Sequence, residues 1–160
     1  MKQVIIDLAQ RLREKDMREV EKMNLALTRL STQSHHDFAP DHALAIAEWL
    51  NSIAAIISTI RQTMAGEVQS ELNLLERHIR GVQITYSTIA EQAKEPVAVS
   101  QSLLRLLAVA FDNAARLIGE WLKWFESPVK PLVFRLSLNP QDRAGLNAVA
   151  QEFDLRRSMQ

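Results

Sequence analysis

Three histidines lie close together in the chain and could bind a metal ion. His35, His36 and His42 are interleaved with two aspartates, and imidazole and carboxylate groups both bind divalent cations. A metal-binding helical protein that uses these histidines is therefore one alternative that the sequence leaves open. We prefer a simpler interpretation, in which residues 32–41 form a polar loop leading into a helix, because two adjacent histidines rarely share one ion. We expect no metal and no cofactor.

The other residue patterns that support catalysis are missing from the sequence. The chain has no cysteine, which excludes disulfides, thiolate zinc sites and a cysteine nucleophile. Its four glycines form no phosphate-binding loop, and there is no Gly-x-Ser-x-Gly motif. Glu76 and His78 are not spaced as the Glu-x-x-His pairs of di-iron bundles. We therefore predict a protein that is not an enzyme, with no catalytic residues.

The charge of the chain bears on nucleic-acid binding. Nineteen basic and nineteen acidic residues give a formal net charge of zero, which disfavours a phosphate backbone as the main partner. A local basic patch is still conceivable in the first helix, formed by Arg11, Arg13, Lys15, Arg18 and Lys22. A second alternative is therefore a nucleic-acid-associated helical small subunit of an effector complex. At the level of fold alone, such a chain resembles the small subunits of CRISPR effector complexes.

The longest regular pattern is a stripe of apolar residues from Ile46 to Ala93, with every step three or four residues long. This period indicates a helix packed against other helices. The unbroken stripe favours one long, bent helix over residues 41–94, whereas Gly66 and Gly81 favour two helices. We favour one helix that continues through Gly66.

Residues 43–60 carry a single charge, Glu48, and reach the shortest length that spans a bilayer. Polar residues aligned on one face favour a buried helix of a bundle instead, and we do not expect a membrane partner.

The remaining pattern completes an all-α prediction. Residues 2–31 and 99–126 have helical periodicity, and the second of these helices is apolar around most of its circumference, as is typical of the centre of a bundle. Asn139 and Pro140 are typical of a helix start. We predict an antiparallel helical bundle with one long central helix, plus a C-terminal extended arm and short helix. The bundle covers residues 1–127, and residues 128–160 pack on it or on a partner.

The segment that joins the last two helices is predicted to be extended. Pro128 and Pro131 oppose a helix, and apolar residues alternate with others over 133–138. A lone strand leaves backbone groups unpaired. It could pair with the same segment of a second subunit, join a partner's sheet or lie across the helices. The predicted partner-binding residues are Val133, Phe134, Leu136, Leu138 and Trp124.

Taken together, these features predict a non-catalytic interaction or assembly protein. It would act as an adaptor or as a small subunit of a larger complex, by oligomerising or by docking on another protein. The N-terminus lacks the uncharged core of a signal peptide, so we expect a cytoplasmic protein. If the extended segment binds the partner, Phe134→Asp should change the assembly state and leave the helix content intact.

Overall fold

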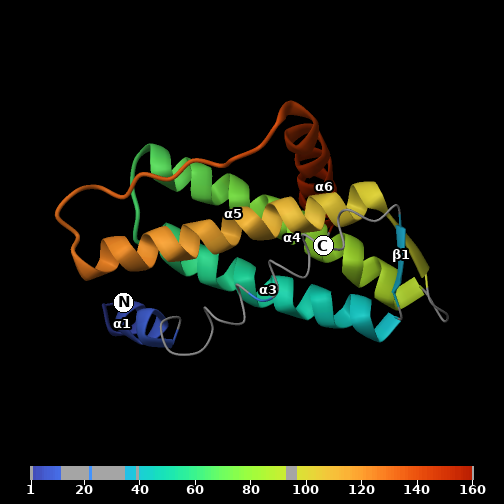
Figure 1. Cartoon of the computed structure of the whole chain (residues 1–160), viewed down its shortest axis with the longest axis horizontal. Helices are drawn as coiled ribbons and strands as arrows, with labels where there is room; N and C mark the ends of the chain where they lie inside the picture. Colours follow the sequence, from blue (N-terminus) through green and yellow to red (C-terminus); the bar gives the residue numbers. More distant parts are fainter. Residues whose placement is uncertain (1, 12–21, 23–34, 39, 93–96, 160) are drawn as a thin grey trace.

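The computed structural model describes residues 2–11, 22, 35–38, 40–92 and 97–159. Within these residues the elements are α1 (Lys2–Arg11), β1 (His35–Phe38), α3 (Pro40–Gln62), α4 (Glu67–Gln92), β2 (Val97–Ser100), α5 (Gln101–Glu126) and α6 (Pro140–Ser158). Figure 1 shows α3, α4 and α5 side by side, with successive helices running in opposite directions. The predicted all-α antiparallel bundle is confirmed.

The chain reverses between α3 and α4, so residues 41–94 contain two antiparallel helices, and the single long helix that we favoured is wrong. The N–H groups of Thr63 and Met64 donate to carbonyls in the last turn of α3 at 3.1 Å. Gly66 has a φ of +79°, a left-handed conformation that costs other residues about 1–2 kcal/mol. The step from Met64 to Val68 keeps the helical spacing across the turn, so the apolar period hides the reversal.

The facing sides of α3, α4 and α5 form the core. The stripe predicted from the sequence is buried on both helices of the hairpin, at Leu50, Ile53, Ile57, Ile60, Leu72, Leu75, Ile79 and Val82. The helix predicted over 99–126 is α5, which begins at Gln101 and buries Phe111, Leu117 and Trp121. The rings of Trp49 and Phe111 lie 4.1 Å apart between centroids. Helix α5 contacts α3, α4 and α6.

Helix α3 is the segment that was weighed as a membrane span. By length and composition alone, Ala43–Gln62 is apolar enough to cross a bilayer. Leu50, Ile57 and Ile60 are each completely buried inside the molecule, in line with the expected helix of a bundle.

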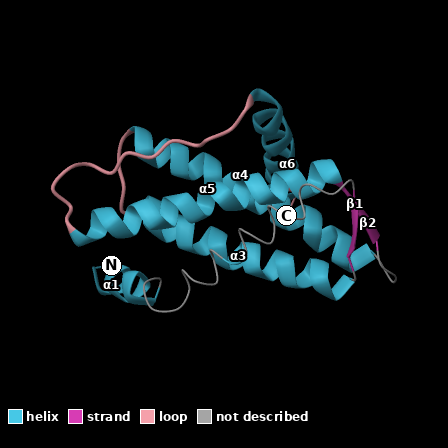
Figure 2. Ribbon diagram, viewed as in Figure 1, coloured by secondary structure: helices cyan, strands magenta, loops and turns pink. Residues whose placement is uncertain are grey.

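A short antiparallel pair of strands lies at one end of the bundle (Figure 2). His35 pairs with Ser100 and Phe38 pairs with Val97. The prediction of a loop over residues 32–41 is therefore wrong where β1 forms. Two four-residue strands far apart in the chain give too short a pattern for sequence periodicity to detect.

Helix α6 packs on α4 and α5, and its predicted start is confirmed. The Asn139 side chain accepts a hydrogen bond of 2.7 Å from the N–H of Asp142, and Pro140 occupies the first turn. Gly81, considered as a helix break, is instead a packing position inside α4. A Cβ there would lie 2.5 Å from the backbone of Val149, so the missing side chain lets the two helices touch.

The first helix is described only in part. The prediction covers residues 2–31, and the structure shows α1 at Lys2–Arg11. The rest of that prediction, apart from Lys22, lies outside the described residues. Leu8 and Ala9 of α1 are buried, and α1 contacts α3.

Candidate partner-binding surface

Residues 127–139 connect α5 to α6 as an extended segment, which we call the arm. Figure 1 shows it leaving the end of α5 and running past α4 to the start of α6. The predicted alternation is confirmed, because Leu132, Phe134 and Leu136 are buried whereas Val133 is 78% exposed. Among the described residues the arm pairs with no strand. Of the three arrangements that we considered, the structure has the arm lying across the helices.

Side chains from the helices bind the backbone of the arm. Glu71 of α4 accepts a hydrogen bond of 2.9 Å from the N–H of Leu136. Asn113 of α5 accepts from the N–H of Ser137 at 2.8 Å and donates to its carbonyl at 3.3 Å. The guanidinium of Arg116, also on α5, donates to the carbonyl of Arg135 at 2.6 Å.

These contacts explain how an extended segment is stable without a neighbouring strand. Successive residues of an extended chain point their backbone groups to opposite sides. Residues 135 and 137 are bound from α5, and residue 136 is bound from α4. The arm is therefore not an open strand edge at these residues, because both sides of its backbone are already bound within the chain.

The predicted partner-binding residues fall into two groups. Phe134 and Leu136 are buried within the chain, and the Arg116 guanidinium lies 4.5 Å from the centre of the Phe134 ring. Leu138 and Trp124 are half-buried, and Trp124 Nε1 donates a 2.6 Å hydrogen bond to the carbonyl of Lys130. Only Val133 is fully presented to the outside. In this conformation Phe134 and Leu136 offer a partner very little side-chain surface.

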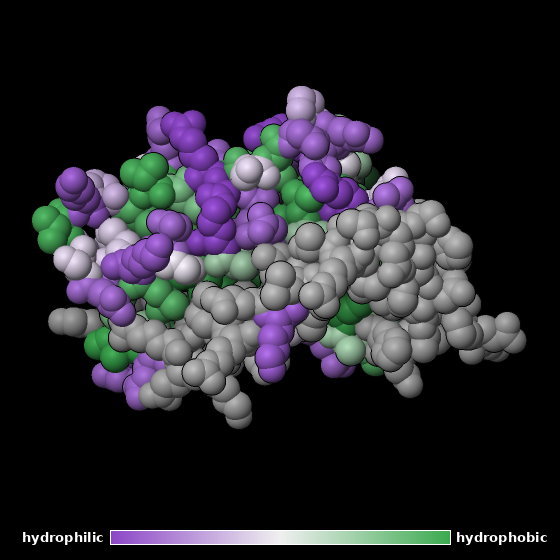
Figure 3. All heavy atoms as spheres, viewed as in Figure 1, coloured by the Kyte–Doolittle hydropathy of each residue, from purple (hydrophilic) through white to green (hydrophobic). Residues whose placement is uncertain are grey.

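Sequence reasoning missed a second exposed residue on the arm. Val129 is 84% exposed and lies between the two prolines that end the helical pattern. That position was the available signal, since a residue between Pro128 and Pro131 belongs to neither the helix nor the alternating segment. Figure 3 shows apolar side chains among hydrophilic ones at the end of the molecule where the arm leaves α5.

Two hollows flank the exposed side of the arm. The first has a volume of about 450 Å³ and lies between α4 and the arm, where Glu67 and Glu71 border it. The second has a volume of about 430 Å³ and lies at the end of α5, where Lys123 and Lys130 border it. Residues 131–133 border both. We call them the acidic hollow and the basic hollow.

The two hollows carry opposite net charges. Arg135 is the one basic residue at the acidic hollow, so its three charged groups sum to −1. Glu120 is the one acidic residue at the basic hollow, so its three charged groups sum to +1. The pairs within each hollow are long, at 3.6 Å for Arg135 with Glu67 and 3.9 Å for Lys123 with Glu120. No acidic group among the described residues forms an ion pair with Lys130.

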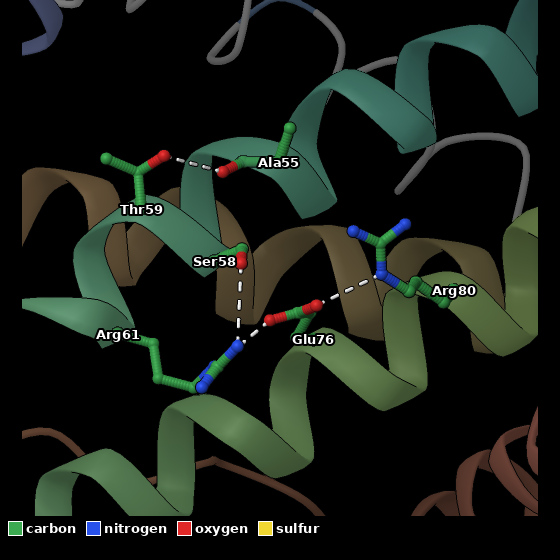
Figure 4. Close-up of polar contacts among 6 residues, drawn as sticks. All are labelled: Ala55, Ser58, Thr59, Arg61, Glu76 and Arg80. Carbon is green, nitrogen blue, oxygen red and sulfur yellow. Dashed lines mark hydrogen bonds and ion pairs between the residues drawn. The ribbon is translucent and has the colours of Figure 1, made fainter. Parts of the chain in front are cut away.

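A separate polar cluster links α3 to α4 (Figure 4). Glu76 accepts from Nε of Arg61 at 3.1 Å and from Nε of Arg80 at 3.0 Å, and Arg61 also approaches the Ser58 hydroxyl at 3.5 Å. One half-buried carboxylate therefore holds two arginines. Because Arg61 comes from the other helix, this contact fixes α3 relative to α4.

Two buried polar residues fix α6. His78 of α4 is completely buried, and its Nε2 lies 2.9 Å from Oδ1 of Asn147. Burial lowers the pKa of His78, and the neighbouring Arg77 and Arg143 charges act in the same direction. Asp142 is buried and forms two hydrogen bonds with Arg105, at 3.0 and 3.3 Å. These bonds raise the pKa of the Arg105 guanidinium.

The other predicted sites lie mostly outside the described residues. Arg13, Lys15 and Arg18 are among the residues that are not described, the side chain of Arg11 is not described, and Lys22 is exposed. The backbones of His35, His36 and His42 belong to β1 and α3, but their side chains are not described. In the part of the chain that the structure describes, no group of three or more metal-ligating side chains is present. The basic patch and the metal alternative therefore stay predictions.

No protein-family model, curated protein or solved structure shows a significant match to this chain.

Proposed function

We propose that this chain is a non-catalytic interaction protein, an adaptor or a subunit of an assembly, and that it docks through the exposed side of the arm. The docking surface consists of Val129, Val133 and the acidic and basic hollows beside them. One observation carries this proposal: an arm whose backbone is bound to two helices displays two valines, 84% and 78% exposed, away from the core.

The anchoring of the arm supports this function. Isolated apolar residues on a surface are common and need no explanation. Here the two valines belong to one short segment and are bordered by hollows that carry charge. Contacts from Glu71, Asn113 and Arg116 hold the segment in place. A surface that is already ordered loses little conformational entropy when a partner binds.

Native mass spectrometry of the chain purified gently from its own host tests the proposal. We expect the wild-type chain to carry a second protein molecule, and Val133→Asp to release it, because a carboxylate in an apolar contact is not solvated. Leu155→Asp is the matched control. Leu155 is also exposed, at 65%, but lies on α6.

Two results would contradict the proposal. The first is a wild-type chain that occurs only as a single species of 18.2 kDa with nothing bound. The second is a complex that persists unchanged in the Val133→Asp variant. Circular dichroism of each variant checks that the helices are intact.

A further inference from the structure

We infer that the partner at the arm is a second copy of this chain, in a twofold dimer that places the acidic hollow of each copy against the basic hollow of the other. This inference rests on the proposed function, since it names the occupant of the same surface. It follows from where the two hollows lie, from their charges and from the position of Val133 between them.

The hollows lie on opposite sides of the arm. Glu67 and Glu71 belong to α4, and Glu71 binds the side of the arm backbone that faces α4. Lys123 belongs to α5, whose Asn113 and Arg116 bind the opposite side. Residues 131–133 lie between the hollows and border both. The exposed surface therefore has a negative side, a central apolar residue at Val133 and a positive side.

A surface with this arrangement is complementary to itself. In a twofold dimer the same patch is used by both copies, so each contact between two different residues occurs twice. An axis that runs along the arm through Val133 exchanges the two sides of the arm. It places the acidic hollow of one copy, with a net charge of −1, against the basic hollow of the other copy, with a net charge of +1. The two Val133 side chains then meet at the axis.

The charges on this surface are available for such contacts. Glu67 has a side chain that is 94% exposed, and its ion pair with Arg135 is long, at 3.6 Å. Exposed pairs of this kind contribute little to stability, so little is lost when they rearrange. Lys130 is exposed and forms no ion pair with any described residue. Complementary charges of this kind determine which surfaces associate, while the valines supply apolar contact.

The backbone contacts limit how the two arms can meet. Because the carbonyl of Arg135 and the N–H of Leu136 already have partners within the chain, the arms do not form a sheet with each other over these residues. The dimer forms through side chains, and the secondary structure of each copy stays the same. We therefore expect the far-ultraviolet circular dichroism of the chain to be independent of its concentration.

Sedimentation velocity of the full chain over a range of concentrations and salt tests the inference. We expect a monomer–dimer equilibrium that high salt weakens. Val133→Asp should raise the dissociation constant by about tenfold or more, since two carboxylates would meet at the axis. Leu155→Asp, the control on α6, should leave the equilibrium unchanged.

A charge exchange gives a test that does not depend on the valine. Lys130→Glu alone should weaken the dimer, because it places a carboxylate against the acidic hollow of the other copy. Adding Glu67→Lys to the same chain should restore association, since the opposite charges are again matched. If either single substitution merely damaged the fold, the double variant would not regain association.

The outcomes separate this inference from the proposed function. A chain that stays monomeric at every concentration overturns the dimer. If the same chain still loses a different protein on Val133→Asp in the native mass spectra, the docking function stands and only its occupant is wrong. A dimer whose dissociation constant is unchanged by Val133→Asp and by Lys130→Glu also overturns the inference, because its interface lies elsewhere.

Discussion

The α3–α4 hairpin is held by apolar side chains that recur every three or four residues, whereas the arm is held by polar side chains that bind its backbone. In the hairpin, Leu50, Ile57, Leu72 and Ile79 are completely buried, and the backbone hydrogen bonds lie within each helix. In the arm, Leu132 and Phe134 are buried, but the backbone depends on Glu71, Asn113 and Arg116. The two regions lie against each other but depend on different interactions.

This difference has a functional consequence. A helix satisfies its own backbone and can present any side chain outward. An extended segment without a neighbouring strand needs hydrogen-bond partners from other parts of the chain. Its position is therefore set by the helices that supply them. The arm therefore has a fixed place on α4 and α5, and its outward residues, such as Val133, have fixed places too. A docking surface benefits from this kind of order.

The same substitution in the two regions should give the largest contrast. We expect Leu72→Ala in α4 to lower the free energy of unfolding by about 2–5 kcal/mol, because it leaves a cavity that the packed helices cannot fill. Leu132→Ala in the arm should cost about 2 kcal/mol, at the lower end of that range, since the arm can settle into the space. Urea unfolding followed by circular dichroism measures both. An equal or larger loss for Leu132→Ala would mean that the arm belongs to the same cooperative core as the hairpin.

The next largest effect should come from Asn113, which is buried on α5. Its side chain binds both backbone groups of Ser137 and the carbonyl of Val109. Asn113→Ala leaves the N–H and carbonyl of Ser137 without this partner, which costs about 1–3 kcal/mol. The arm should loosen more than the hairpin, so limited proteolysis with trypsin should cut faster after Arg135.

Ser52→Ala is the matched control for this variant. The Ser52 hydroxyl donates to a backbone carbonyl within α3 at 3.3 Å and is exposed, so its loss should change stability by less than about 0.5 kcal/mol. If Asn113→Ala unfolds the chain at lower urea but leaves cleavage of the arm unchanged, then Asn113 stabilises α5 alone.

Local patterns in the sequence predicted local structure well. The end of α5 at Glu126, the Asn139 cap and the alternation around Phe134 all follow from residues within one or two turns of each other. The all-α bundle follows from the stripe between Ile46 and Ala93, because its period shows which face of each helix is buried. The turn at Gly66 could not be predicted for the same reason. The apolar residues on either side of it keep the helical spacing, so the pattern does not reveal that the chain reverses.

Contacts between distant residues could not be read from one sequence. Glu71 and Leu136 are 65 positions apart, and nothing near either of them indicates the other. From the sequence alone, the arm is predicted to be a strand with unpaired backbone groups, and Phe134 is predicted to contact a partner. The structure buries Leu132 and Phe134 and exposes Val133 between them, so our proposal assigns the contact with a partner to Val133 instead.

The smallest expected effect concerns His78, a polar residue on the buried, otherwise apolar side of α4. His78 follows the same helical face as Leu75 and Val82 but contacts Asn147 of α6. Burial and the charges of Arg77 and Arg143 lower the pKa of His78 below its usual 6.5, while the Asn147 hydrogen bond and the Glu71 charge oppose the shift. Below pH 6.5 the unfolded chain therefore binds more protons at this residue than the folded chain does.

The sign of the pH dependence follows from this difference. The contribution of a neutral, buried His78 to stability is complete above pH 6.5 and is lost as the pH falls towards the pKa of the folded state. Urea unfolding at a series of pH values should show it as a stability that declines with acidification. His78→Gln keeps a polar side chain opposite Asn147 but cannot titrate, so its stability should decline less over the same interval. Equal declines in the two proteins would assign the pH dependence to other groups.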